Sequence, residues 1–153
     1  MARIESTILV PISVEDTFSF LNTRESHLKF IPRIMAFDQT SPGTFGEVGT
    51  TVAGMLNYFG IRIPVEYEMI EVEPNRRLAM KGQMGPVVFT DGYLISKHGA
   101  GTEIKFWLEL KPTGWTKIFT PLARLIGTLH AWETLRNLKR AIQTWEVSET
   151  SQV

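Results

Sequence analysis

Asp91 is the side chain best placed for acid–base chemistry. It shares the two-residue period of Phe89, Tyr93 and Ile95 in a predicted strand, which would set a carboxyl group among apolar side chains. Burial there would raise its pKa and suit proton transfer. The alternative is that the strand changes phase at Gly92, or that Asp91 opens a turn or pairs with an arginine at the rim. Because strand register is hard to fix from sequence, we favour this alternative and keep Asp91 only as a catalytic candidate.

Tyrosine and methionine side chains could serve a ligand without changing it. Tyr58, Tyr67 and Tyr93 could orient a carbonyl or hydroxyl group, although buried tyrosines with one satisfied hydroxyl are common in ordinary cores. Flexible methionines suit ligands of variable shape, although they also simply fill cores. The methionines in predicted strands are Met35, Met55, Met69, Met80 and Met84.

Nothing in the residue spacing indicates a metal or a cofactor. His27, His98 and His130 fall in a predicted short helix, a hairpin turn and a long helix, so no local spacing suggests a shared metal. The absence of cysteine excludes disulfides, thiolate nucleophiles and cysteine metal sites. The glycine-containing segment 99–101 is predicted to be a hairpin turn, not a phosphate loop. We therefore expect no metal and no cofactor.

The charge balance excludes partners that bind through bulk charge. Lys and Arg total 16, as do Asp and Glu, in a chain of 153 residues, so nothing draws it to nucleic acid or to an acidic membrane. No stretch approaches the roughly 20 apolar residues that span a bilayer, and the first residues resemble neither a signal peptide nor an anchor. We expect a cytoplasmic protein without stable membrane insertion, made of one domain over 1–147 and a flexible tail over 148–153.

Periodicity and capping predict the elements that must position these side chains. Alternation predicts a strand over 3–10. Ser13, with Asp16 three residues later, favours a helix over 14–21, and a second short helix is expected over 25–31. Six further strands are expected between residues 33 and 111, with a break of phase near Ile70 that a bulge would correct. Consecutive hairpins form an antiparallel meander, so the fold class is α+β with about seven strands.

One long helix is expected at the C-terminal end. Thr120 and Pro121 suit its start, and no turn signal follows for about 25 residues. Its apolar stripe winds around the axis, so either the helix bends near Gly127 or a curved sheet contacts it from more than one side. Small residues at Ala123, Gly127 and Ala131 would admit a closely packed neighbour or a ligand. The stripe comprises Ile118, Leu122, Leu125, Leu129, Trp132, Leu135, Leu138, Ile142 and Trp145.

A strand, two short helices, a six-stranded meander and a long helix occur in this order in the helix-grip fold. The segments VPISVEDTFSFL (10–21), VEPNRRL (72–78), GAGTEI (99–104) and LRNLKRAI (135–142) resemble the START-like (SRPBCC) superfamily and its polyketide cyclase/dehydrase-like branch. The resemblance implies that lipids, polyketides or other apolar ligands bind between sheet and helix. It carries over no catalytic residue, because the superfamily shares no catalytic motif.

A curved sheet cannot contact a straight helix along its whole concave face, so space remains there for a ligand. The strand phases and the helix stripe predict which side chains face that space. The expected ligand-binding residues are Leu56, Tyr58, Val65, Tyr67, Met69, Met80, Phe89, Tyr93, Phe106, Leu108, Leu122, Leu125, Leu129 and Trp132.

Three functions remain open from the sequence. The first is binding or carriage of an apolar small molecule, without catalysis. The second is a polyketide-type cyclase or dehydratase that uses the same cavity. The third is a protein-interaction module that meets its partner through an exposed Trp107 or Trp115. We favour the first because the residues form no catalytic constellation. The ligand and the oligomeric state do not follow from the sequence.

Overall fold

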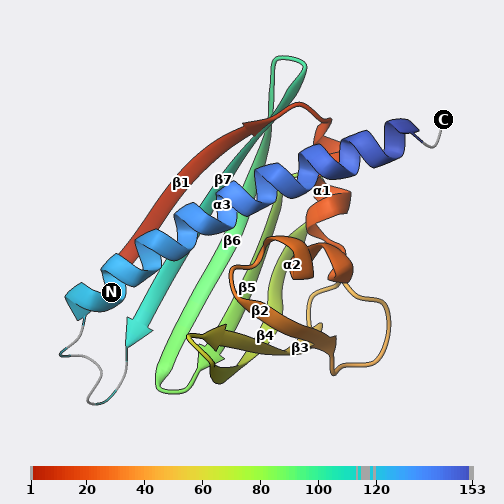
Figure 1. Ribbon diagram of the computed structural model, residues 1–153. Coiled ribbons are helices and arrows are strands. Elements are labelled where there is room, and N and C mark those ends of the chain that lie inside the picture. Colours follow the sequence, from red (N-terminus) through yellow and green to blue (C-terminus); the bar gives the residue numbers. More distant parts are fainter. Residues whose placement is uncertain (1, 113, 115–117, 119, 152–153) are drawn as a thin grey trace.

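The computed structural model of the protein describes residues 2–112, 114, 118 and 120–151. It consists of a seven-stranded antiparallel sheet, two short helices after the first strand, and a long C-terminal helix that crosses one face of the sheet (Figure 1). The elements are β1 (Ala2–Val10), α1 (Val14–Leu21), α2 (Arg24–Phe30), β2 (Ile34–Gln39), β3 (Thr51–Tyr58), β4 (Ile61–Glu73), β5 (Arg77–Met84), β6 (Val87–His98), β7 (Gly101–Pro112) and α3 (Thr120–Ser151).

The strand order is β1-β7-β6-β5-β4-β3-β2. The six strands after α2 form the predicted meander, and β1 joins it by pairing with β7, from Ala2 opposite Leu110 to Val10 opposite Thr102. The register of β4 against β5 shifts between Met69 and Glu71. This confirms the bulge predicted at Ile70, which keeps apolar side chains on the inner face on both sides of the shift.

Local sequence signals explain the two short helices. The Ser13 hydroxyl accepts a hydrogen bond from the Asp16 backbone N–H at 3.1 Å, which confirms the predicted cap of α1. The second helix starts one residue earlier than predicted, at Arg24, and ends at Phe30, two residues before Pro32. Both helices lie over the same face of the sheet as α3 (Figure 1).

The C-terminal half of α3 packs into the core, where Leu135, Leu138 and Ile142 are buried. In its N-terminal half the small side of the helix faces the sheet. A Cβ atom on Gly127 would lie 2.6 Å from Leu110 Cδ1 and 2.7 Å from Ile4 Cδ1, so the glycine permits a close approach to β7 and β1.

Trp107, on the outer face of the sheet, was predicted to be exposed. Trp107 is half-buried: the Arg3 guanidinium lies over its ring at 4.8 Å, and a Cβ on Gly92 would lie 2.8 Å from it. The expectation of an exposed Trp107 was therefore wrong, because the absence of a side chain at Gly92 lets the indole lie flat on the sheet. Trp115 lies outside the described residues. Of the predicted tail 148–153, residues 148–151 continue α3, and 152–153 are not described.

A cavity between the sheet and the C-terminal helix

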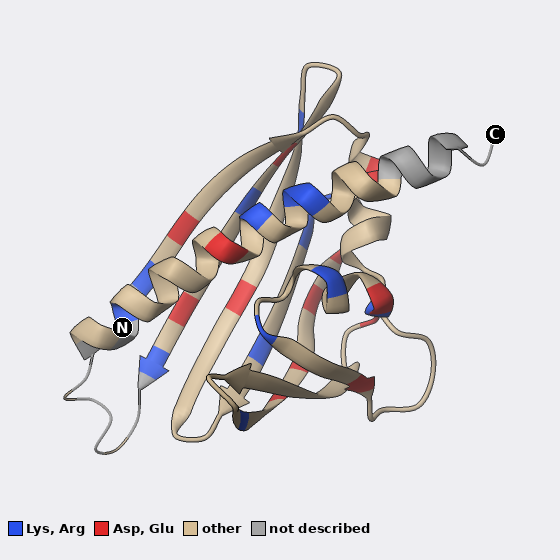
Figure 2. Ribbon diagram, viewed as in Figure 1, with Lys and Arg blue, Asp and Glu red and all other residues tan. Residues whose placement is uncertain are grey.

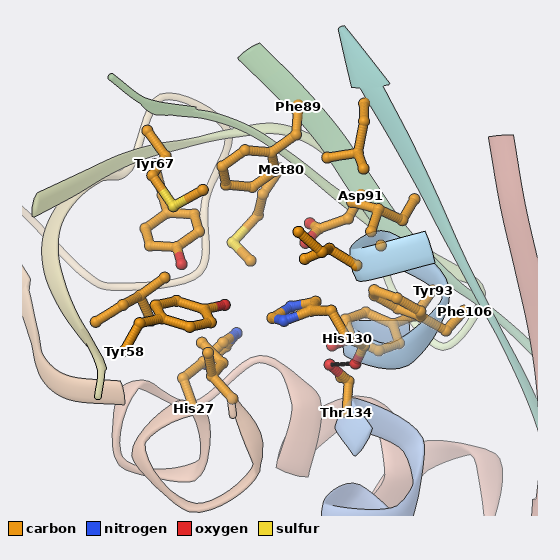
Figure 3. Close-up of a pocket in the computed structure, with 17 residues that line it drawn as sticks. His27, Tyr58, Tyr67, Met80, Phe89, Asp91, Tyr93, Phe106, His130 and Thr134 are labelled. Carbon is orange, nitrogen blue, oxygen red and sulfur yellow. Dashed lines mark hydrogen bonds between the residues drawn. The ribbon is translucent and has the colours of Figure 1, made fainter. Parts of the chain in front are cut away.

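A cavity lies between α3 and the inner face of the sheet, beside the close contact that Gly127 makes with β7 and β1. It contains about 700 Å³ of space free of protein atoms, including the part that opens to solvent. Apolar side chains from β3 to β7 form its floor, and α2 and α3 cover it (Figure 3). Its lining comprises His27, Ile31, Leu56, Tyr58, Tyr67, Met80, Met84, Phe89, Asp91, Tyr93, Phe106, Leu108, Leu110, Ile126, Gly127, His130 and Thr134.

Asp91 belongs to the floor of this cavity. It is paired across the sheet with Met80 on one side and Leu108 on the other, so its immediate neighbours on the inner face are apolar. The strand keeps one phase through Gly92, since Phe89, Asp91 and Tyr93 all line the cavity. The favoured expectation of a phase change, a turn or a rim ion pair was therefore wrong. Hydrogen bonding of β6 to two central strands fixes the register that the sequence left open.

The Asp91 carboxyl has unusual electrostatics. The residue is 8% exposed, and its Oδ1 atom is buried with no hydrogen-bond partner among the described residues. Burial raises the pKa of Asp91 from 3.8 to about 7, because the charged form loses its hydration without gaining a counter-ion. A buried acceptor without a partner is unfavourable for the fold alone and is a common mark of a functional site.

Three tyrosines from three strands share the cavity. Tyr58, Tyr67 and Tyr93 come from β3, β4 and β6, and within the described part of the chain none of their hydroxyl groups has a hydrogen-bond partner. Burial, and then the nearby Asp91, raise the pKa of Tyr67 and of Tyr93. All three are therefore neutral phenols that can donate or accept a hydrogen bond inside the cavity.

Two histidines that sequence reasoning did not connect also meet here. His27 from α2 and His130 from α3 both line the cavity, and Figure 3 shows the His130 imidazole projecting into its centre. Burial lowers the pKa of each to about 4, so both are neutral at pH 7. The His27 Nδ1 lies 2.8 Å from the Thr23 carbonyl oxygen and must donate to it, which leaves Nε2 as an acceptor.

The helix presents different residues to the cavity from those predicted. Ile126, Gly127, His130 and Thr134 line it, and the Thr134 hydroxyl donates to the His130 carbonyl at 2.7 Å. We predicted that the apolar stripe of α3 faces the cavity. For the N-terminal half of the helix this was wrong, because Gly127 and Ala131 form the side that approaches the sheet most closely. The predicted residues that instead are at least half exposed are Leu122, Leu125, Leu129 and Trp132.

Most of the strand residues predicted for the cavity do line it. Two of them are buried but do not line it: Val65 lies in the core, and Met69 borders a smaller hollow behind Asp91. Among the methionines, Met80 and Met84 line the cavity, whereas Met35 is exposed. The predicted strand residues that line the cavity are Leu56, Tyr58, Tyr67, Met80, Phe89, Tyr93, Phe106 and Leu108.

A bidentate ion pair anchors α3 beside this cavity. Arg33, in the turn after α2, donates to the two carboxylate oxygens of Glu133 at 2.6 and 3.2 Å. The Arg33 guanidinium also lies over the Tyr58 ring at 5.1 Å. The pair joins the α2–β2 turn to the helix and holds one wall of the cavity in position.

The lining is suited to some ligands and not to others. No Lys or Arg occurs among the described residues of the lining, so a buried anion would find no counter-ion from them. The described residues contain no group of three His, Cys, Asp or Glu side chains arranged to hold a metal ion. No helix among them is long and apolar enough to cross a membrane. The site can therefore enclose an apolar body and offer hydrogen bonds from neutral groups and from Asp91.

Known proteins resemble this chain in fold and family. The family described as polyketide cyclase / dehydrase and lipid transport matches residues 1–143. No curated protein matches the sequence. Among solved structures, TTHA0849 from Thermus thermophilus superposes with a TM-score of 0.77 at 12% identity, over 94% of this chain and 98% of that one. Ara h 8.0201 gives 0.72 at 11% identity, over 93% and 98%. The di-domain ARO/CYC BexL from the BE-7585A biosynthetic pathway gives 0.76 at 14% identity, over 94% of this chain and 47% of BexL.

Proposed function

Because the chain belongs to the polyketide cyclase / dehydrase and lipid transport family, we propose that it binds an uncharged hydrophobic small molecule in the cavity under α3. The single observation that carries the proposal is the Asp91 carboxyl, whose Oδ1 atom is buried in a largely apolar cavity with no hydrogen-bond partner among the described residues. Neither the apolar space nor the buried acceptor improves the stability of the empty protein, so both are better explained by a ligand.

The lining supports an apolar body for the ligand. The aromatic rings of the floor contact one another, with 5.7 Å between the ring centres of Tyr67 and Phe89 and 5.2 Å between those of Tyr93 and Phe106. Rings in such arrangements stack or meet edge-on with a flat ligand. The flexible side chains of Met80 and Met84 can adapt to its outline.

The polar groups of the cavity support a hydrogen-bond donor at one end of the ligand. Asp91 Oδ1 and His27 Nε2 are acceptors, and the tyrosine hydroxyls can accept as well. A ligand hydroxyl could donate to Asp91 whether or not that group is ionised. A ligand carboxylate would lie beside Asp91 without a cation, so we propose that anionic ligands are excluded.

Three probes that share a naphthalene ring test this proposal by isothermal titration calorimetry at pH 7.5. 2-Naphthol carries a donor, 2-methoxynaphthalene has lost it, and 2-naphthoate is an anion. We expect 2-naphthol to bind about tenfold more tightly than 2-methoxynaphthalene, as one buried hydrogen bond would give. We expect 2-naphthoate to bind more weakly than either, because burial leaves its charge unpaired.

Substitution of Asp91 makes the test specific. The preference for 2-naphthol should persist in Asp91→Asn, whose amide oxygen still accepts, and vanish in Asp91→Leu. Glu66→Gln is a matched control, because this carboxylate lies on the exposed face of β4. Failure of all three probes to bind, together with native mass spectra of the host-purified protein that always show an empty chain, would refute the proposal.

A second candidate function is cyclisation or dehydration of a polyketide-like substrate. It is favoured by one observation: burial places the pKa of Asp91 at about 7, where a carboxyl can both accept and donate protons. The test is incubation with a linear poly-β-ketone thioester, followed by mass spectrometry of the products. Loss of water from the substrate that Asp91→Asn abolishes, while this variant still binds 2-naphthol, would support catalysis. An unchanged substrate would exclude this class.

A further inference from the structure

Phe59, in the turn between β3 and β4, makes no contribution to the packing of the core. Tyr58 pairs with Ile61, so Phe59 and Gly60 form a two-residue turn, with φ of 55° and 86°. Turns with positive φ at both central residues strongly favour Asn-Gly, because a bulky residue is strained there. Phe59 is also 99% exposed. A strained and fully exposed aromatic side chain indicates contact with something outside the chain.

A second exposed apolar surface lies on the first turns of α3. Leu122, Leu125 and Leu129 are each at least half exposed, and they follow one another at spacings of three and four, so they lie on one face of the helix. Ile126 is also half exposed and at the same time lines the cavity. This apolar face therefore continues directly into the opening of the cavity.

The two surfaces lie at the same end of the sheet. In an antiparallel meander alternate turns fall at the same end, which brings together the β3–β4 turn, the β5–β6 turn and the end of β7 that precedes α3. Tyr58, next to Phe59, and Ile126 both line the cavity, so each surface adjoins it. We call this end the mouth surface and define it by Phe59, Ile61, Leu122, Leu125, Ile126 and Leu129.

The charge around the mouth surface is one-sided, although the chain as a whole is balanced. Of the segments that reach this end, 51–65, 84–90 and 110–132 contain no Asp or Glu. The nearest acidic residues on the β1–β7 edge are Glu5 and Glu109, and both form ion pairs with Arg3. The first acidic residue along α3 is Glu133, and Figure 2 shows no acidic (red) segment on the helix before this region. Arg62, Lys111 and Arg124 are exposed, and none forms an ion pair with any described residue. The apolar surface is thus bordered by free cations.

We propose that the mouth surface docks on a lipid bilayer that contains anionic lipids, with the Phe59 ring inserted among the acyl chains. Apolar side chains bordered by cations are the chemistry of proteins that lie on membrane surfaces. A second copy of this chain fits less well, because pairing through the same surface would bring Arg62, Lys111 and Arg124 against their equivalents with no acid between them. The proposal does not depend on ligand binding, although docking would place the cavity opening against the bilayer.

Vesicle flotation tests the proposal on the full chain. Vesicles of phosphatidylcholine alone are compared with vesicles of phosphatidylcholine and phosphatidylglycerol at 70:30. The wild type should float with the mixed vesicles, bind pure phosphatidylcholine about tenfold more weakly, and dissociate as salt is raised. Phe59→Asn should weaken binding to the mixed vesicles about tenfold, since one buried aromatic ring is removed.

This variant separates docking from folding. Asn suits the turn better than Phe, so Phe59→Asn should unfold at the same temperature as the wild type or a higher one. Leu125→Gln tests the helix side of the mouth surface, and Arg62→Glu should weaken binding at least fivefold, as loss of one cation near the surface predicts. Val48→Asn is the matched control: Val48 is also largely exposed but lies in the β2–β3 loop, away from the mouth, and should leave binding unchanged.

Three results would overturn the proposal. The first is no binding of the wild type to the mixed vesicles. The second is equal binding by Phe59→Asn, Leu125→Gln and the wild type. The third is a dimer in light scattering that Leu125→Gln dissociates, without vesicle binding by either protein, because the mouth surface would then join two copies of the chain.

Discussion

Burial of Asp91 disfavours its charged form, so the protonation of this residue depends on pH near neutrality. Its neighbours across the sheet are Met80 and Leu108, and none of the described residues that line the cavity is Lys or Arg. Residue phase in the sequence raised the possibility that Asp91 faces the cavity, although we favoured a change of phase, a turn or an ion pair at the rim. The pairing of β6 with β5 and β7 decides that Asp91 points inward. Residues close to Asp91 in the sequence do not encode this pairing.

Asp91→Asn should change the pH dependence of stability. The pKa of Asp91 is about 7 in the folded protein against an ordinary value of 3.8, so between these values the folded state holds a proton that the unfolded state has lost. The contribution of Asp91 to stability therefore falls as the pH rises from about 4 to 7. We expect Asp91→Asn to gain stability relative to the wild type over this range, by up to about 4 kcal/mol.

The measurement is urea unfolding of both proteins at a series of pH values. His27 and His130 titrate in the opposite sense, since burial lowers the pKa of each to about 4, but they are common to both proteins and cancel in the difference. A difference in unfolding free energy that stays constant from pH 4 to 8 would contradict a buried, protonated Asp91.

The histidines show the limit of residue-level prediction. His27 and His130 stand more than one hundred positions apart in the sequence, and their spacing gave no reason to connect them. They meet because α2 and α3 cover the same part of the sheet. The available signal was weak: His27 lies in a predicted helix beside apolar residues, which also describes an ordinary core histidine.

At the scale of elements, α3 has two halves with different partners. The winding apolar stripe indicated this division, since it implied that the halves face different directions. The C-terminal half buries its large side chains between the sheet and the short helices. The N-terminal half turns Gly127 and Ala131 toward β1 and β7 and leaves its leucines exposed. The sequence therefore predicted the helix and the division, but not which side of the first half faces the sheet.

Two leucines on the same helix should respond very differently to truncation. Leu138 is fully buried, so Leu138→Ala should lower the free energy of unfolding by about 2–5 kcal/mol through lost burial and a new cavity. Leu129 is half exposed, and Leu129→Ala should change it by less than about 1 kcal/mol.

Urea unfolding of both variants, with circular dichroism to verify helix content, provides the check. Both changes replace leucine by alanine within one helix, so the helix propensity gained is the same and only the burial differs. Equal losses in the two variants would mean that the exposed face of α3 is covered in solution, which would bear directly on the mouth surface.

At the scale of the molecule, antiparallel topology brings separate segments to one end. The β3–β4 turn, the β5–β6 turn and the start of α3 each lack acidic residues, and each looks unremarkable alone. Only their convergence creates an apolar, positively bordered opening on a chain with no net charge. The bulk charge balance, which argues against attraction to an acidic membrane, averages over the two ends and conceals this asymmetry.

The sequence by itself determined the elements, their order, the antiparallel meander, the bulge at Ile70 and most of the apolar floor of the cavity. These features depend on local periodicity, capping and turn chemistry, which neighbouring residues encode. Tertiary structure alone decided that Asp91 faces inward, that two histidines join it, and that the leucines of the first half of α3 remain outside. Each of these depends on how closely distant segments approach one another, as at Gly127 against Leu110 and Ile4, and no local pattern records that distance.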